Sequence, residues 1–245
     1  MIDAIKAEGG RAPRIIDAST AHRVAPGWVY GFPELCAGQA EAVRQADRVA
    51  NPGCYATGAI ALLRPLIEAG LLSPEHPVCL PSVSGYTGGG RPMIEAYEAG
   101  TAAPFELYAL GLGHKHIPEI MACTGLTRRP VFVPAVANFA QGMLVQLPLH
   151  LSDLNGSPSL HDLHAALAAG DGGGAHWSVL SGKGPDDGPI RTRRRQQPAD
   201  GRPGEGARLG RHVRRKAQRI RATLRCCSGC VHRLGRQHAA GARRA

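Results

Sequence analysis

The chain has 245 residues, of which 43% are hydrophobic, so it is long enough for one large domain or two ordinary ones. It contains no run of about 18 apolar residues and no apolar signal core near its start, which argues against a spanning helix and against export. Its net charge of +10 is uneven: residues 181–245 hold 18 Lys and Arg against 4 Asp and Glu, whereas residues 1–180 hold 11 against 15. The basic balance therefore belongs to the tail, and no uniform nucleic-acid-binding surface is predicted.

Seven cysteines are scattered along the chain rather than arranged as a disulfide framework. Without an export signal they are expected to be reduced thiols of a cytoplasmic protein. The tail stretch "CCSGC" contains a Cys-x-x-Cys pair, but no second pair completes a four-ligand zinc site, so no metal is predicted. No role is assigned to the tail cysteines Cys226, Cys227 and Cys230.

Predicted strands and helices alternate between residues 12 and 170, which indicates an α/β or α+β fold. A short buried strand, Ile15 and Ile16, ends at Asp17, and "PGWVYGFPEL" after it is expected to be a loop. A short strand that passes into a turn is expected in "DRVANPGC" (47–54), and further strands are expected near 76–86, 130–139 and 142–151. Helices are expected near 36–46, 55–69 and 92–99, from Pro118 onward, and over 157–170 with Ser157 or Ser159 as N-cap. Residues 181–245 are rich in Arg, Gly and Pro and are expected to be disordered.

The first candidate site is Cys54 in "VANPGCYATGAIALLRPL", directly before a predicted helix. Free N–H groups and the positive dipole end of a helix favour a thiolate, which is a nucleophile for an activated acyl carbon. The alternative is a small, packed core residue, and the residue type alone favours that alternative.

The second candidate site is "GHKHIPE", in which His114 and His116 lie two residues apart, before a helix that starts near Pro118. A histidine there can act as a general base near neutral pH, and Glu119 is placed to orient it. Two exposed loop histidines are an equally weighted alternative, and His-x-His alone is a weak metal motif.

Two arginines are candidate anion contacts: Arg23 in "DASTAHR" and Arg91 after the glycine-rich "SGYTGGG". A guanidinium group grips phosphate or carboxylate bidentately, and glycines at 85 and 88–90 would let the backbone approach a ligand. The sequence contains neither a Gly-x-Gly-x-x-Gly turn near its start nor a Walker motif.

Taken together, these stretches resemble the N-acetyl-gamma-glutamyl-phosphate reductases of arginine biosynthesis, in their shorter bacterial form. The resemblance rests on "IDASTAHRVAPGWVYGFPEL", "VANPGCYATGAIALLRPL", "SVSGYTGGGRPMIEAYE", "YALGLGHKHIPE" and "FVPAVANFAQGMLVQLPL", which occur in the family's order across residues 14–170. Asn-Pro-Gly-Cys-Tyr combined with His-Lys-His-x-Pro-Glu is far more specific than either motif alone.

The resemblance implies a Rossmann-type domain that holds NADP, followed by an α+β domain for catalysis and dimerisation. It implies NADPH-dependent reduction of an acyl phosphate, N-acetyl-gamma-glutamyl phosphate, to the semialdehyde through a cysteine thioester, with release of phosphate. It also implies a homo-oligomer, with no nucleic-acid or membrane partner. An acyl phosphate already carries a good leaving group, so the chemistry needs no metal.

The residue roles follow from the same resemblance. Cys54 matches the nucleophile, and His116 matches the general acid/base. Six further residues are expected to bind the substrate: Ser19, Arg23, Asn51, Arg91, His114 and Glu119. Ser84 and Gly85 lie in the loop that would approach the nicotinamide of the cofactor.

The expected organisation has three parts: residues 1–53 are the later part of the cofactor domain, 54–180 the catalytic domain, and 181–245 a basic tail. On this view the chain starts beyond the family's nucleotide-binding glycines, and the tail is a frameshifted reading of the gene. Three alternatives stay open: an enzyme like aspartate-semialdehyde dehydrogenase, a non-catalytic remnant of the reductase, and a tail that binds nucleic acid. The tail's lack of interleaved aromatic residues counts against the last.

Overall fold

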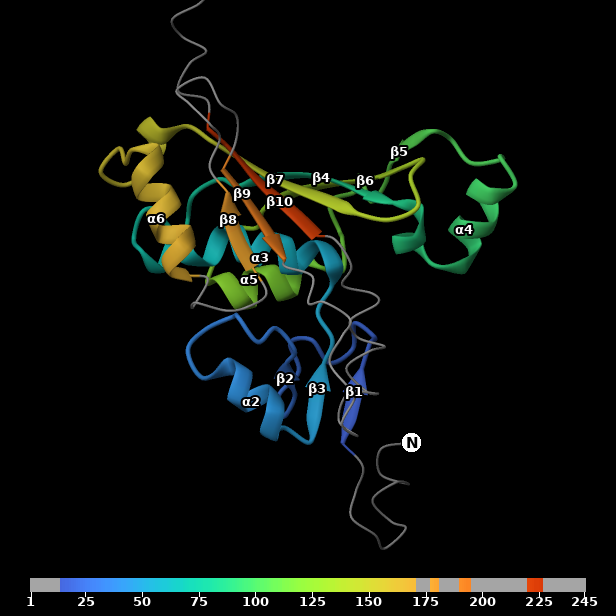
Figure 1. The fold of residues 1–245 in the computed structure, drawn as a ribbon, viewed down its shortest axis with the longest axis horizontal. Coiled ribbons are helices and arrows are strands. Elements are labelled where there is room, and N and C mark those ends of the chain that lie inside the picture. The colour runs from blue at the N-terminus through green and yellow to red at the C-terminus, as the bar shows by residue number, and fades with distance from the viewer. Residues whose placement is uncertain (1–13, 171–176, 181–189, 195–219, 227–245) are drawn as a thin grey trace, which may run out of the picture.

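The structure is a computed structural model that describes residues 14–170, 177–180, 190–194 and 220–226. Its smaller sheet holds three short parallel strands in the order β1-β3-β2. These strands are β1 (Ile15–Asp17), β2 (Val29–Tyr30) and β3 (Arg48–Ala50), and helix α2 (Gln39–Gln45) lies between β2 and β3 in the chain. The strand β3 leads directly into the segment that precedes Cys54 (Figure 1).

The larger sheet has seven strands in the order β5-β6-β4-β7-β10-β9-β8. Its central strands are β4 (Cys79–Gly85), β6 (Val131–Ala137) and β7 (Met143–Leu149), and β5 (Phe105–Leu107) forms one edge. Toward the other edge lie β10 (Ile220–Cys226), β9 (Ile190–Arg194) and β8 (Trp177–Leu180). Strand β4 is parallel to β6 and antiparallel to β7, and β7 is parallel to β10, so the sheet is mixed.

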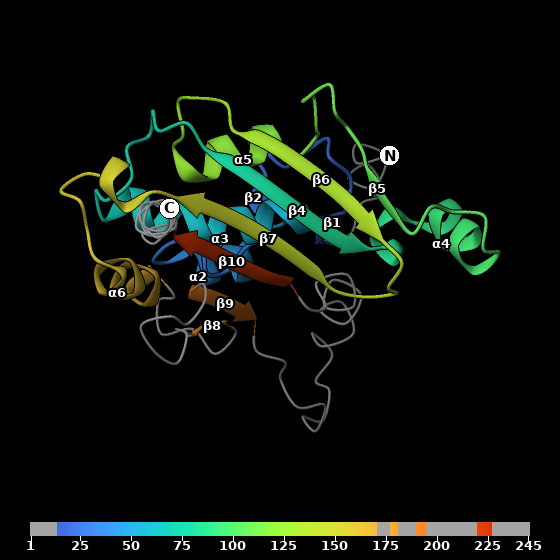
Figure 2. The same ribbon diagram turned by 90° about the horizontal axis from the view of Figure 1, so that it is seen from above.

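The helices α3 (Cys54–Glu68) and α5 (Ile117–Thr124) lie between the two sheets (Figure 1). The view from above shows these two helices behind the large sheet, so both cover the same face of it (Figure 2). Helix α6 (Leu160–Gly170) lies beside α3, whereas the short helix η1 (Tyr86–Gly89) and α4 (Arg91–Glu98) form an arm at the opposite end. Within the described residues, no helix is long and apolar enough to cross a membrane.

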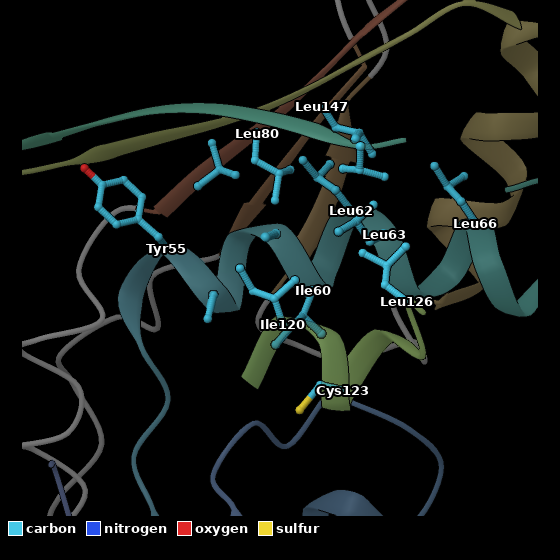
Figure 3. Packing of buried hydrophobic residues seen from close by; sticks show 14 of the residues in the cluster. Tyr55, Ile60, Leu62, Leu63, Leu66, Leu80, Ile120, Cys123, Leu126 and Leu147 are labelled. Atoms are coloured by element: carbon cyan, nitrogen blue, oxygen red, sulfur yellow. The ribbon is translucent and has the colours of Figure 1, made fainter. Parts of the chain in front are cut away.

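Helix α3 is the central element of the core. Nine of its residues are buried, and they lie on several sides of the helix because it is packed between a sheet and another helix. Figure 3 shows Leu80 and Leu147 of the large sheet above α3, and Ile120 and Cys123 of α5 below it. Removing such a side chain would leave a cavity, which typically costs about 2–5 kcal/mol for Leu to Ala. The N-terminus of α3 is therefore held by a rigid core.

The helix ends follow local sequence signals. Helix α3 stops before Gly70, whose φ of +70° lies in the left-handed region, and the Gly70 and Leu71 amides donate to carbonyls of the last turn. Helix α5 has a proline in its first turn and ends at Gly125, with φ of +78°. Helix α6 is capped by Ser159, whose hydroxyl accepts the Asp162 amide at 3.3 Å, while the Asp162 carboxylate accepts the Ser159 amide at 2.8 Å.

The alternating α/β organisation expected between residues 12 and 170 is confirmed, and the predicted helices appear within a few residues of their expected bounds. Two details differ. The segment expected to be only a loop contains strand β2, which pairs with β3. Ile16 was expected to be buried but is 38% exposed. Its strand, β1, lies at the edge of the three-stranded sheet.

The expectation of a disordered tail is wrong for two of its segments. Residues 190–194 form β9, and residues 220–226 form β10, which pairs with β7 along seven residues. The reason is visible in "IRATLRC", which alternates apolar and polar residues with the period of a strand. Its residues Ile220, Ala222 and Leu224 are in register with three buried residues of β7. The other tail residues, Cys227 and Cys230 among them, lie outside the described residues, and the three-part division of the chain stays a prediction.

Candidate active site

The candidate site is built where β3 passes into α3. Asn51, Pro52 and Gly53 connect the two elements, and Gly53 is the N-cap residue that precedes Cys54. The Gly53 carbonyl accepts both the amide and the hydroxyl of Thr57, each at 2.9 Å. The Asn51 amide donates to the Asp17 carbonyl at 2.7 Å, which ties the same loop to the end of β1. The backbone on both sides of the cysteine is thus fixed by hydrogen bonds.

A buried carboxylate, Glu119 of α5, joins the elements around this loop. It is 1% exposed and accepts three hydrogen bonds. Its Oε1 accepts Arg23 Nη1 at 2.7 Å, and its Oε2 accepts both the Tyr30 hydroxyl at 2.6 Å and the Gly53 amide at 2.9 Å. Burying a charge is expensive unless it is paired and hydrogen-bonded, and here both conditions are met. Glu119 therefore connects α5, β2 and the start of α3.

Gly53 leaves no room for a side chain. A Cβ built on it would lie 2.5 Å from Glu119 Oε1 and 2.5 Å from both Cδ2 and Nε2 of His116. These are closer than real Cβ contacts, so one of the two side chains would have to shift. The imidazole of His116 and the carboxylate of Glu119 therefore lie directly against the residue that precedes Cys54.

The thiol of Cys54 is partly buried at the first position of α3. Burial raises its pKa, and this outweighs the Tyr55 and Cys54 amides and Arg23, all of which lower it; the charge of Glu119 raises it further. A helix N-terminus was expected to favour the thiolate, and the direction here is the opposite. The resting group is thus a protonated thiol that needs a base when it reacts.

The two histidines are buried rather than exposed, so the alternative of two exposed loop histidines is wrong. His114 is 8% exposed and His116 is 4% exposed. Burial lowers the pKa of His116 to about 2, and the neighbouring His114, Arg23 and Lys115 lower it further. Burial likewise lowers the pKa of His114 to about 4, with Lys115 and Arg23 as smaller causes. Both rings are therefore neutral at neutral pH and able to accept a proton.

The histidines differ in their partners. His114 Nδ1 accepts the backbone amide of His116 at 3.1 Å, which assigns its proton to Nε2. Its ring is surrounded by the rings of Tyr55, Tyr108, Phe132 and His116. His116 Nδ1, by contrast, is buried and has no hydrogen-bond partner among the described residues.

The structure brings most of the expected site residues together. Arg23 donates through Nε to the Asn51 carbonyl at 3.1 Å and through Nη1 to Glu119, so it ties the cysteine loop to α5. Ser19 lies at the edge of this group: it is exposed, and its hydroxyl donates to Asp17 at 2.6 Å. That hydrogen bond is the main reason why the pKa of the Asp17 carboxyl is lowered. The contact of Asp17 with the cysteine loop is made by its backbone carbonyl, which accepts the Asn51 amide.

Three expected residues have other surroundings. Arg91 lies on the α4 arm, with its side chain 89% exposed, and pairs with Glu95 one turn away. Ser84 is 4% exposed on β4, and its side chain lowers the pKa of the Tyr55 phenol, which burial raises. A Cβ on Gly85 would meet the backbone carbonyls of residues 139 and 140, so this glycine is required by contacts within the protein. No described contact joins Arg91 to the group around Cys54.

Sequence reasoning missed three tyrosines of the site. Tyr30 donates to Glu119, Tyr55 donates to the Ala135 carbonyl at 2.7 Å, and the centroid of the Tyr108 ring lies 5.8 Å from that of His114. Tyr55 directly follows Cys54, so its place could have been inferred from the helix start. Tyr30 gave no such signal, because its partner is 89 residues away in the chain. Among the described residues, no three His, Cys, Asp or Glu side chains form a group that could hold a metal ion.

Comparisons with known proteins found one family model and a set of named relatives that match this chain. A family model described as semialdehyde dehydrogenase, dimerisation domain, matches residues 54–171. Proteins named N-acetyl-gamma-glutamyl-phosphate reductase from Brucella ovis and Brucella canis are each 56% identical to this chain over 165 residues. The match covers 65% of this chain and 53% of each relative. The chain thus spans about half the length of the curated relatives it matches.

Proposed function

From its relation to the N-acetyl-gamma-glutamyl-phosphate reductases, we propose that this chain carries the acylation site of such an enzyme. The proposed overall reaction is reduction of N-acetyl-gamma-glutamyl phosphate to N-acetylglutamate semialdehyde in arginine biosynthesis, with NADPH as reductant. The observation that carries the proposal is the group around Gly53: Cys54 stands at a helix start, Glu119 and His116 are packed against the residue before it, and Arg23 binds Glu119 and the Asn51 carbonyl. A cysteine packed only for its volume would not require these polar partners.

The proposed step at Cys54 is acyl transfer. The sulfur attacks the acyl carbon of the substrate, a carbon–sulfur bond forms, and the bond from that carbon to the phosphate oxygen breaks. Phosphate leaves with the bonding electron pair, and the acyl group stays on Cys54 as a thioester. Because burial raises the pKa of this thiol, its proton must leave as the sulfur attacks.

His116 is the proposed acceptor of that proton. Its imidazole is neutral, and Nε2 is the ring nitrogen that lies against Gly53. A depressed pKa makes it a weak base at rest, so we expect proton transfer to accompany bond formation rather than to precede it. Arg23 uses Nε and Nη1 for Asn51 and Glu119, which leaves Nη2 for a substrate oxygen. Ser19, Asn51 and His114 are proposed to line the substrate side of the same group.

The described residues give little support for a dinucleotide site at Ser84 and Gly85. Ser84 is 4% exposed on β4, and Gly85 is packed against backbone carbonyls, so neither presents an accessible group to a nicotinamide. The parallel strands β1 and β3 resemble part of a nucleotide-binding sheet, but the sequence has no glycine fingerprint near its start. We therefore derive no reduction step from these two residues, and NADP stays a proposal from the relatives.

We further propose that two copies of the chain associate. The family model is described as a dimerisation domain, and the described helices α3 and α5 cover only one face of the large sheet (Figure 2). Residues that alternate with its buried ones, among them Val83, Val133 and Leu144, are only half-buried in the single chain. Light scattering on the purified chain would measure its mass, and a monomer at micromolar concentration would contradict this proposal. The cytoplasmic location stays a prediction.

The acylation proposal is tested without cofactor. The full chain is mixed with N-acetyl-gamma-glutamyl phosphate, and released phosphate and intact mass are measured together. We expect one phosphate per active site and one N-acetylglutamyl group, mapped to Cys54 and removed by hydroxylamine. Cys54→Ala should abolish both signals, whereas Cys36→Ala, which changes an exposed thiol, should leave them unchanged. Absence of acylation in the unmodified chain would overturn the proposal.

The same assay separates the alternatives. Faster acylation by beta-aspartyl phosphate than by the glutamyl compound would favour an enzyme like aspartate-semialdehyde dehydrogenase. Acylation that is not followed by consumption of added NADPH would favour a chain that keeps the chemical site but not the complete reaction. Consumption of NADPH with release of the semialdehyde would establish the whole activity.

A further inference from the structure

The hydroxyl of Tyr30 has no role in the acylation step proposed above. Tyr30 lies on β2, is 8% exposed, and donates its hydroxyl proton to Glu119 Oε2 at 2.6 Å. Burial raises the pKa of Tyr30 far above its usual value, with the Glu119 charge and the hydrogen bond to it as further causes. The group therefore stays protonated and remains a donor at every pH at which the protein would be studied.

The oxygen that receives Tyr30 is also the oxygen that holds the cysteine loop. Glu119 Oε2 accepts the Gly53 amide at 2.9 Å, and Gly53 directly precedes Cys54. The other carboxylate oxygen, Oε1, accepts Arg23. The Tyr30 hydroxyl and the Gly53 amide thus donate to the same oxygen, Glu119 Oε2. The hydroxyl on β2 therefore helps to fix the position of this oxygen and to balance its charge, and the oxygen in turn holds the start of α3.

We propose that Tyr30 is a positioning residue for Cys54, acting through Glu119 on the Gly53 amide. The proposal deepens the function proposed above, because it assigns a residue that sets the reactivity of the same nucleophile. The substrate class is therefore the one proposed for the Cys54 site, an acyl phosphate. Tyr30 does not touch the reacting atoms in this account; its effect reaches them through one carboxylate.

The sign of the effect follows from the charges that face Cys54. Glu119 raises the pKa of the Cys54 thiol, and Arg23 and the amides of Tyr55 and Cys54 lower it. Loss of the Tyr30 hydroxyl removes one donor from Glu119, so the carboxylate charge acts on the thiol with less compensation. The thiol then ionises at higher pH, and its reaction with an electrophile near neutral pH becomes slower.

The test measures alkylation of Cys54 by iodoacetamide against pH, with the Cys54 peptide quantified by mass spectrometry. The exposed Cys36 in the same digest serves as an internal standard. We expect Tyr30→Phe, which keeps the buried ring, to move the pH midpoint for Cys54 upward and to slow its alkylation near neutral pH by about two- to five-fold. The midpoint for Cys36 should not move.

The chain offers a matched control for the lost hydroxyl. Tyr97 also has a buried hydroxyl, but that group has no hydrogen-bond partner among the described residues, and it lies on the α4 arm. Tyr97→Phe should therefore leave the Cys54 midpoint unchanged. If both tyrosine variants moved the midpoint equally, the effect would be general and the proposal would fail.

A second variant, Glu119→Gln, keeps the proposal testable if Tyr30→Phe folds poorly. Glu119→Gln removes the charge that raises the thiol pKa, so it should move the Cys54 midpoint downward, opposite to Tyr30→Phe. In the double variant, the further change Tyr30→Phe should have no effect, because its route runs through the carboxylate. An undiminished Tyr30 effect without the Glu119 charge would overturn the proposal.

The result of the iodoacetamide experiment does not depend on the result of the acylation assay. Iodoacetamide reads Cys54 directly, so the comparison needs neither substrate nor cofactor. If Cys54 is acylated by the acyl phosphate but Tyr30→Phe alkylates like the unmodified chain, only the role of Tyr30 is refuted. If Tyr30→Phe shifts the midpoint but no acylation occurs, the proposed function fails and the link from Tyr30 to Cys54 stands.

Discussion

The segment that carries Arg23 and the arm that carries Arg91 place the same kind of ion pair in opposite surroundings. Arg23 meets Glu119 at 2.7 Å with side chains 9% and 1% exposed, whereas Arg91 meets Glu95 at 2.7 Å with side chains 89% and 61% exposed. The distances are equal, so burial and the number of partners distinguish the pairs. A distance alone therefore says little about what an ion pair contributes.

The buried pair belongs to a network and the exposed pair does not. Glu119 has three donors from three parts of the chain, and Arg23 has a second acceptor in the Asn51 carbonyl. Arg91 and Glu95 lie one turn apart on the same helix, where water can replace either partner. The comparison predicts that removing Arg23 lowers the stability of the fold strongly, because Glu119 would stay buried without its cation. Removing Arg91 should lower stability little, because water can solvate Glu95.

The largest effect is expected for Arg23→Met. It leaves the Glu119 charge buried without its cation, and breaking a buried pair in this way typically costs about 3–5 kcal/mol. Arg91→Met, the matched change on the arm, should cost less than about 0.5 kcal/mol, as for other exposed helix pairs. Urea unfolding followed by circular dichroism measures both. Equal losses would show that burial does not separate the two pairs.

Acid should destabilise the half of the molecule that carries the buried histidines. The pKa of His116 falls from 6.5 in the unfolded chain to about 2 in the folded one, so between these values the unfolded chain binds the extra proton. Stability is therefore full above about pH 6.5 and is lost as the pH falls, by about 1.4 kcal/mol per pH unit for one such group. Urea unfolding at several pH values between 6.5 and 4.5 measures the slope. His116→Gln should make it smaller, and an unchanged slope would contradict the assignment.

An intermediate effect is expected for Gly53→Ala. The new methyl group would lie 2.5 Å from His116 and Glu119, and relieving such an overlap typically costs about 1–3 kcal/mol. Gly113→Ala is the control, since nothing lies within 4 Å of a Cβ there. Thermal unfolding midpoints of the two variants should differ clearly. Cys54 alkylation should also change only in Gly53→Ala, and a normal Cys54 profile in that variant would show that the close packing has no influence on the nucleophile.

The smallest effect is expected from the choice of replacement at His114. Asn can place an acceptor where Nδ1 lies, whereas the amide of Gln extends to the position of Nε2. Because Nδ1 accepts the His116 amide, His114→Asn should be more stable than His114→Gln by about 1 kcal/mol. Chemical unfolding of both variants gives the difference. A more stable Gln variant would mean that Nε2, not Nδ1, makes the important contact.

Much of the local structure could be predicted from the sequence. Spacing of apolar residues placed α3 and its end before Gly70, Pro118 marked the start of α5, and Ser159 was one of two expected caps of α6. These signals work because they depend on a few neighbouring residues. Strand β10 carried the same kind of signal in "IRATLRC", but the surrounding Arg, Gly and Pro concealed it.

The site could be predicted only in part. Cys54, His116, Glu119 and Arg23 were identified from motifs and from resemblance. The structure places Glu119 and His116 against the residue before Cys54, and Arg23 on Glu119. The amides at the helix start lower the pKa of Cys54, as the sequence predicted, but burial, which depends on elements far away in the chain, raises it more. The motif around Arg91 suggested an anion contact in the same way, without showing that its helix lies on a separate arm.

The sequence by itself determined the approximate positions of the α-helices, that a cysteine stands at the start of α3, and that two histidines precede α5. Those properties are local, set by backbone preferences and by the period of apolar residues. Only the tertiary structure decided that Arg23 and Tyr30 meet Glu119, across 96 and 89 residues of chain. The physical reason is that a buried carboxylate must collect donors from whatever elements pack around it, and that packing is a property of the whole fold.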